Sequence, residues 1–233
     1  MNENLYVQGY LQYWDDLLLR NPELWIDSCA SGGRRNDLET LRRSVPLHYS
    51  DCGYGDIPVK LAYRHTLYQW IPYFKGVTLT WDQDPPVDVD SFAVHCAMAA
   101  MLASSVDIHR EDFDFGSVKE AFGVWRRAAP YLLNGDFYPM TPHSRNTDRW
   151  VAWQFDRPEY GAGLLQAVRQ TACPYEALTA RLKGLEPEAN YLFENPESGE
   201  SFHRFGADAM RDGVTVSLAR RSGGIWFYKK VCA

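Results

Sequence analysis

The chain has 233 residues, of which 45% are hydrophobic and 23% are charged, and its formal net charge at pH 7 is -6. This composition is that of a folded chain with a buried core, not of a disordered one. Basic residues occur as pairs scattered among acidic ones, so nucleic acid is not expected as a partner. No apolar run reaches the about 18 residues that span a bilayer, so no membrane association is expected.

The cysteines are five in number and widely spaced, which argues against a disulfide framework. No signal peptide is visible, and we expect a reducing, cytoplasmic location. Neither a Cys-x-x-Cys pair nor a cluster of histidines accompanies them, so we expect no metal and no cofactor. The cysteines are Cys29, Cys52, Cys96, Cys173 and Cys232.

Residues 3–20 are predicted to form a helix that Asn21 and Pro22 end. Its large apolar residues recur at the spacing of one helix face, and packing against a core explains them. They are Tyr6, Tyr10, Trp14, Leu17 and Leu18.

Residues 24–51 predict a strand, a helix and a second strand. The strands are expected at 24–27 and 45–49, and the helix begins near Asn36, with Glu39 three residues later. Polar residues follow both strands. Because sites in parallel α/β folds lie at the carboxyl ends of the strands, we expect a site at this edge.

The turn that follows the first strand contains Ser31, Gly32 and Gly33. Two glycines can adopt positive φ and bring backbone N–H groups close to a ligand such as a sugar. A tight loop without a ligand explains them equally well, and both interpretations stay open. Cys29 alone is more often a small buried residue than a nucleophile.

Helical spacing returns in residues 59–70, and residues 76–81 read as a third parallel strand. Trp81 follows at the strand end, where it either stacks on a sugar ring or packs against the core. Residues 89–104 are apolar nearly all round and predict a buried helix in which His95 is a hydrogen-bonded core residue. A short strand is expected at 105–109, and a further helix covers residues 116–133.

From Asn134 onward short segments separated by turns replace the helical periods. They predict about eight strands, which is typical of an antiparallel β-sandwich. Ser222, Gly223 and Gly224 are expected to form a hairpin turn before the last strand. The expected strands are 137–138, 150–155, 163–169, 175–182, 190–194, 201–205, 214–218 and 225–230.

The motif Cys29-Ala-Ser-Gly-Gly-Arg34, followed about one βα unit later by Ser50-Asp51, resembles the α-galactosidases (melibiases) of glycoside hydrolase family 36. Looser agreement runs through Gly135-Asp-Phe-Tyr138, the Trp-x-x-Trp of residues 150–153 and the closing Phe-Tyr-Lys. The resemblance implies an α/β fold. Residues 1–133 would be the C-terminal half of a (β/α)8 barrel, and residues 134–233 the antiparallel β-sandwich that follows it.

This resemblance also implies a retaining glycoside hydrolase that acts on terminal α-galactosyl groups. Asp51 would be its general acid/base, and Cys29 and the glycines would contact the galactose. The family's nucleophile, an Asp in a Lys-x-Asp motif, has no counterpart upstream of Asp27. We expect Asp27 to support the binding site, and Arg34 either binds a sugar hydroxyl or pairs with Asp37.

Three hypotheses follow for the chain as a whole. It is an α-galactosidase or the part of one that carries the acid/base, or a non-catalytic carbohydrate-binding remnant, or an assembly partner. An isolated half barrel has two open sheet edges, so we expect association with a second copy or with a separate N-terminal half. The expected ligand is an α-galactoside or a related oligosaccharide. For Asp37 and Asp56, helix capping or loop solvation is the stronger interpretation.

Overall fold

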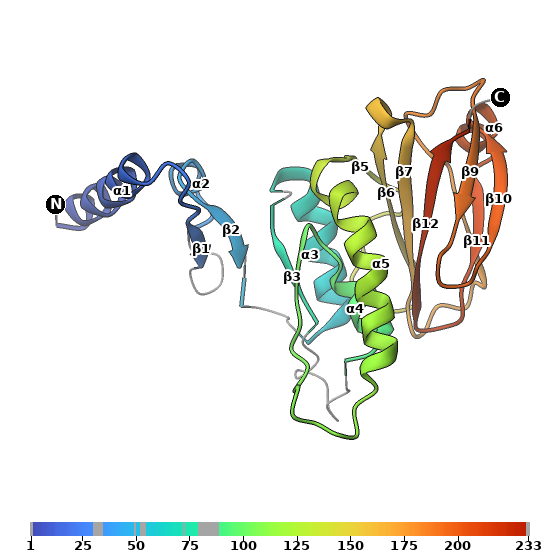
Figure 1. Cartoon of the computed structure of the whole chain (residues 1–233), viewed down its shortest axis with the longest axis horizontal. Helices are drawn as coiled ribbons and strands as arrows, with labels where there is room; N and C mark the ends of the chain where they lie inside the picture. Colours follow the sequence, from blue (N-terminus) through green and yellow to red (C-terminus); the bar gives the residue numbers. More distant parts are fainter. Residues whose placement is uncertain are drawn as a thin grey trace. The chain divides into compact units, whose positions relative to one another are not determined.

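The structure is a computed structural model that describes residues 2–29, 35–48, 50–51, 55–71, 73–78 and 89–231. The chain divides into two compact units, shown in Figure 1 with colours that follow the sequence. The first unit comprises Met1–Cys52 and Tyr73–Lys75, and the second comprises Gly53–Pro72 and Gly76–Ala233.

The first unit contains two parallel strands with a short helix between them, which confirms the predicted β-α-β order. Its long first helix is tied to the short one by Arg43. The guanidinium of Arg43 donates to both carboxylate oxygens of Asp15, at 2.6 and 2.9 Å, and to Glu39 Oε2 at 2.8 Å. The elements are α1 (Asn2–Arg20), β1 (Asp27–Cys29), α2 (Leu38–Leu41) and β2 (Val45–His48).

Asp27 begins its strand, whereas the sequence predicted that it would end it. Leu24 N donates to Asn21 O at 2.9 Å, which holds residues 21–24 in a turn, and the pairing with β2 starts only at Ile26 O, which accepts from Val45 N. In the register of the parallel pair, Asp27 lies opposite Val45 and Cys29 lies opposite His48. Asp27 therefore lies about 7 Å along its strand from the carboxyl end of β1.

Three helices of the second unit begin at an aspartate whose side chain caps the first turn. Asp56, Asp90 and Asp114 accept hydrogen bonds from backbone N–H groups of α3, α4 and α5. Across the described residues, no helix combines the length and the apolar character that crossing a membrane requires. The elements of this region are α3 (Ile57–Trp70), β3 (Lys75–Val77), α4 (Ser91–Ala97), β4 (Met101–Ala103) and α5 (Phe115–Asn134).

The long helix predicted over residues 89–104 is wrong in its second half. Helix α4 ends at Ala97, the backbone turns extended at Met98 with ψ of 120°, and residues 101–103 form β4 beside β3. Thr78 N donates to Ala103 O at 3.1 Å just beyond this pairing. The short strand expected at 105–109 is therefore displaced to 101–103. A continuously apolar run does not distinguish a buried helix from a buried strand.

The eight strands predicted after residue 134 are confirmed, and their pairings in the described part of the chain are antiparallel. Six of them form one sheet in the order β10-β9-β12-β7-β6-β5, and β11 pairs with β8 in a second, small sheet. The strands are β5 (Asp136–Pro139), β6 (Trp150–Arg157), β7 (Ala162–Arg169), β8 (Ala177–Ala180), β9 (Asn190–Glu194), β10 (Ser201–Phe205), β11 (Val214–Ser217) and β12 (Ser222–Lys230).

Strands β6 and β7 are buried along nearly their whole length because both faces of the six-stranded sheet are covered. One face packs with β8 and β11 into a single apolar core. The other face lies under the helices α3, α4 and α5 (Figure 1), which the predicted division at residue 133 would separate from it. That domain boundary stays a prediction. The core residues include Trp150, Ala152, Leu165, Ala167, Trp226 and Tyr228 from the large sheet and Leu182, Val214 and Val216 from beside it.

Arg64 of α3 is a main link between the helices and the sheet. Its side chain is 1% exposed, and its guanidinium donates to Cys96 O at 2.8 Å and to Gln166 Oε1 at 3.1 Å. The guanidinium also lies 4.5 Å from the ring centroid of Trp153, within the range of a cation–π interaction. His95 Nε2 lies 2.9 Å from Glu197 Oε1, which confirms the predicted hydrogen-bonded core histidine.

The predicted hairpin turn at Ser222, Gly223 and Gly224 is wrong, because these residues form the start of β12 and pair with β7. The chain turns one residue earlier, at Arg221, whose φ is 56°. A Cβ atom at Gly223 would lie 2.4 Å from the Cβ of His95. Glycine is needed here because α4 approaches the sheet closely, not because the chain reverses.

Candidate active site

The carboxyl edge of β1 and β2 carries the first group of candidate residues. Ser28 is 4% exposed, and its hydroxyl donates to Val45 O at 3.3 Å, which ties the two strands together. Cys29, the last residue of β1, has an exposed free thiol. Successive side chains alternate between the faces of a strand, so the buried Ser28 leaves Cys29 on the open side.

Asp51 follows β2 by three residues. Ser50 is buried, with 8% of its surface exposed, and Asp51 is exposed. Because β1 and β2 are parallel, their carboxyl ends lie at the same edge, and both Asp51 and Cys29 follow from that edge. The prediction that both residues lie at one edge of the sheet is therefore consistent with the strand directions.

Five of the predicted site residues fall outside the described residues, and their roles stay predictions. Asp27 is described and exposed, but it begins β1 and does not share the edge where Cys29 lies. The five are Ser31, Gly32, Gly33, Arg34 and Trp81.

Asp37 and Asp56 are helix caps, as predicted. Asp37 accepts hydrogen bonds from Thr40 N at 2.9 Å and from the Thr40 hydroxyl at 2.8 Å, and these bonds lower the pKa of its carboxyl group. The sequence predicted that this helix begins near Asn36, and the structure has the cap one residue later, at Asp37. Asp56 accepts from Val59 N at 3.1 Å at the start of α3.

Replacing the cap at Asp56 should affect stability in a residue-specific way. Asp56→Ala should lower the free energy of unfolding by about 1 kcal/mol, because Val59 N loses its acceptor. Asp56→Asn should change it by only a few tenths of a kcal/mol, since Asn caps as well as Asp. Urea titrations of the parent and both variants measure the difference. Equal losses in the two variants would show that the charge, and not the cap, is what Asp56 supplies.

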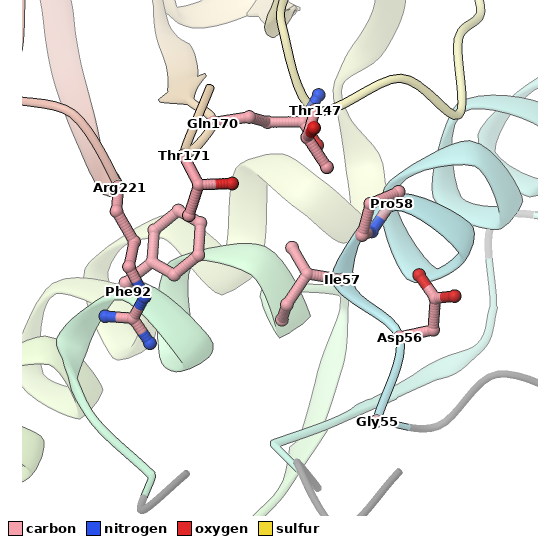
Figure 2. A pocket seen from close by; sticks show the side chains of 9 residues that line it. All are labelled: Gly55, Asp56, Ile57, Pro58, Phe92, Thr147, Gln170, Thr171 and Arg221. Carbon is pink, nitrogen blue, oxygen red and sulfur yellow. The ribbon is translucent and has the colours of Figure 1, made fainter. Parts of the chain in front are cut away.

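The second unit contains a cleft that the sequence did not reveal. It has a volume of about 280 Å³ and is formed by the start of α3, the start of α4 and three loops that join strands. Figure 2 shows the residues that line it, with Gln170 and Thr171 on one side and Ile57 and Pro58 on the other. No pattern in the sequence connects them, because they come from five separate segments. The lining residues are Gly55, Asp56, Ile57, Pro58, Phe92, Thr147, Gln170, Thr171 and Arg221.

Known proteins that this chain resembles are α-galactosidases, although no family model matches it. It is 23% identical over 215 residues to the bifunctional α-galactosidase/sucrose kinase of Mediterraneibacter gnavus, which covers 91% of this chain and 22% of that protein. The α-galactosidase of Lactobacillus brevis has a similar structure, with a TM-score of 0.80 and 17% identity over 98% of this chain and 32% of that one. A family 36 α-galactosidase of Geobacillus stearothermophilus, solved with raffinose, gives a TM-score of 0.77 and 19% identity over 97% and 31%.

The chain therefore spans less than a third of the length of the proteins it matches. Within that part the similarity is nearly continuous, and the structural agreement shows a shared fold. The resemblance predicted from the sequence is confirmed: over most of its length this chain is similar to the C-terminal part of the α-galactosidases of glycoside hydrolase family 36.

Proposed function

We propose that this chain carries the acid/base half of a retaining α-galactosidase site. Asp51 is the general acid/base, and Cys29 with the turn at Gly32 and Gly33 binds the galactosyl group. The observation that supports this most is the parallel pairing of β1 and β2, since parallel strands end at the same edge and Cys29 ends β1 while Asp51 follows β2 by three residues. The similarity to α-galactosidases over most of the chain supports hydrolysis of α-galactosides as the reaction at that edge.

In a retaining mechanism the two carboxyl groups lie about 5 to 5.5 Å apart. A carboxylate attacks the anomeric carbon while Asp51 donates its proton to the departing glycosidic oxygen. Asp51 then removes a proton from water, which attacks the glycosyl-enzyme and releases galactose with its configuration retained. Asp27 is an unsuitable nucleophile because it lies near the opposite end of the strand pair. The attacking carboxylate therefore belongs to a strand other than β1 and β2.

The first unit would then be part of an incomplete barrel. Parallel sheets are normally covered on both faces and contain more than two strands, and an open strand edge readily accepts another strand. Residues 1–133 accordingly form the C-terminal half of a (β/α)8 barrel, and residues 134–233 form an antiparallel β-sandwich. A second copy of the chain or a separate N-terminal half supplies the remaining strands and the nucleophile.

Oligosaccharides with a terminal α-galactosyl group are the substrates that this proposal implies. The similar enzyme of Geobacillus stearothermophilus was solved with raffinose and, in another structure, with stachyose. Such a substrate needs a proton donor for its leaving group, and Asp51 provides one.

A complementation assay with a nitrophenyl α-galactoside tests the proposal. We expect no turnover by this chain alone and turnover after a polypeptide with the N-terminal half of a related barrel is added. Light scattering should show that the chain alone associates. Turnover that is the same with the wild-type chain and with Asp51→Asn, or no turnover in any mixture, would contradict the proposal.

The alternative is a carbohydrate-binding or assembly fragment without catalysis. It is favoured by one observation, that the described residues offer no second carboxylate at the edge that carries Asp51. Galactose binding by the chain together with absent turnover in every complementation mixture would support it. Absence of both binding and turnover would leave an assembly role.

A further inference from the structure

The cleft of the second unit is lined by none of the described residues that are proposed for catalysis. It lies between the first turn of α3 and the loops at Thr147, at Gln170 and Thr171, and at Arg221 (Figure 2). Two apolar side chains, Ile57 and Phe92, form its floor, and they are buried, with 8% and 5% of their surface exposed. A volume of about 280 Å³ is at the lower end for small-molecule sites and suits a ligand of about one sugar ring.

Gln170 gives this cleft a buried hydrogen-bond acceptor without a partner. Its side chain is 2% exposed, and its amide nitrogen donates to Asn146 O at 2.7 Å and to Arg149 O at 3.3 Å. These two carbonyl acceptors fix which end of the amide is nitrogen. Within the described part of the chain, Gln170 Oε1 has no hydrogen-bond partner. An unpaired buried acceptor costs about 1 to 3 kcal/mol, which a ligand that donates a hydrogen bond would recover.

The charges around the cleft select the kind of ligand. Arg221 is the cation on its lining, and it is already paired with Asp90 and lies 4.8 Å from the ring centroid of Phe92. Asp56 also belongs to the lining and adds a carboxylate, one oxygen of which accepts from Val59 N. Among the described residues, the lining thus has no excess positive charge with which to attract an anion. It offers oxygen acceptors and the hydroxyl groups of two threonines.

We propose that this cleft binds a neutral polyhydroxylated ligand of about one sugar ring. One hydroxyl group donates to Gln170 Oε1, and others bond to the carboxylate of Asp56 and to the Thr171 hydroxyl, with Ile57 and Phe92 below the ring. This site is independent of Asp51 and of galactoside hydrolysis. It would take up a sugar or a polyol whether or not the chain is catalytically complete.

Nuclear magnetic resonance of the whole chain tests the proposal through the side-chain amide signals of Gln170. Titration with D-galactose, D-glucose or glycerol should shift these signals together with the backbone amides of Asp56 and Thr171. Binding should weaken about tenfold in Asp56→Asn, which keeps the helix cap, and about threefold to tenfold in Thr171→Val. Thr215→Val, which changes an exposed threonine of β11, is the matched control and should bind as the parent does.

The Asp51→Asn variant separates this site from the proposed catalytic site. The same shifts and the same affinity are expected in that variant. Shifts that disappear with Asp51→Asn would overturn the proposal, because the ligand would then occupy the other site. The proposal would also be overturned if D-galactose, D-glucose and glycerol all left the Gln170 signals unshifted. The same holds if these signals shifted only when Ca²⁺ was added.

Discussion

The Asp51→Asn variant of the complemented protein should hydrolyse an α-galactoside with a poor leaving group about 10² to 10⁴ times more slowly than the parent. Asn has the same size as Asp but cannot donate a carboxylic proton. The glycosidic oxygen would then leave as an alkoxide, which is a poor leaving group. The kcat/KM for raffinose is the quantity to measure, because it reports the first bond cleavage.

The dependence on the leaving group distinguishes lost acid catalysis from a misfolded site. A dinitrophenolate leaves without protonation, so kcat/KM for a dinitrophenyl galactoside should change little in Asp51→Asn. Azide attacks a glycosyl-enzyme without a general base, so it should restore turnover of that substrate and yield a galactosyl azide. Equal losses with both leaving groups and no azide product would reject Asp51 as the acid/base.

Two further carboxylates of the first unit serve as controls. Glu23→Gln changes an exposed residue before β1 and should leave both substrates unaffected. Asp27→Asn should raise KM more than it lowers kcat if Asp27 supports binding. A loss of kcat in Asp27→Asn as large as that in Asp51→Asn would make Asp27 the nucleophile, against the register of β1 and β2.

Asp156 should make the stability of the second unit depend on pH in an unusual direction. Asp156 is 3% exposed, and its burial raises the pKa of its carboxyl group to about 6, although Tyr228 partly counters this by donating to Asp156 Oδ1 at 2.6 Å. The nearby Asp136 and Glu159 raise the pKa of Asp156 further. An aspartate in the unfolded chain has a pKa of about 3.9.

Between these two values the folded protein binds more protons than the unfolded chain. The free energy of unfolding therefore falls as the pH rises from about 4 to about 6, and Asp156 adds no further slope above or below that window. Two pKa units correspond to about 3 kcal/mol. Most salt-bridged carboxylates act in the opposite sense, since acid destabilises the proteins that contain them.

The Asp156→Asn variant isolates this effect. The difference in free energy of unfolding between the parent and the variant should change by about 3 kcal/mol between pH 4 and pH 7, in favour of Asn at the higher pH. Any constant cost of the new amide cancels in this comparison. Urea titrations at a series of pH values, followed by the fluorescence of the buried Trp153 and Trp226, measure it.

Two other variants sharpen that test. Tyr228→Phe removes a hydrogen bond that lowers the pKa of Asp156, so the window should extend to higher pH. Asp148→Asn changes an exposed carboxylate and should keep the slope of the parent. Parallel pH profiles for the parent and Asp156→Asn would show that Asp156 does not retain its proton in the folded protein.

Helices and strands with clear periodicity could be predicted from the sequence, and elements defined by distant contacts could not. The helix at 116–133 and the eight later strands show their apolar period locally. Helix α4 ends before residues 101–103 because these pair with β3, and Gly223 is a glycine because His95 lies against it. Neither neighbour is visible in the local sequence, so composition alone gave a longer helix and a turn.

The candidate site could be predicted only as far as one motif extends. Cys29 ends β1 and Asp51 follows the neighbouring parallel strand β2, so a βα pattern was sufficient to predict one edge for both. The cleft at Gln170 gathers segments more than a hundred residues apart, and no local rule connects Asp56 with Thr171. Alternation along β6 could have identified Asp156, because it shares a face with Trp150 and Ala152, the core side of the sheet.

Strands β6 and β7 are covered on both faces, by helices on one and by β8 and β11 on the other. This limits which parts of the chain can be exchanged with another protein. Helix α5 contacts both strands, and the guanidinium of Arg127 lies 4.1 Å from the ring centroid of Phe227. A gene fusion that joined only the strands to a foreign barrel would leave Trp153, Phe155 and Phe227 facing water. During evolution, or in a chimaera made in the laboratory, the strands and α3 to α5 must therefore be inherited as one block.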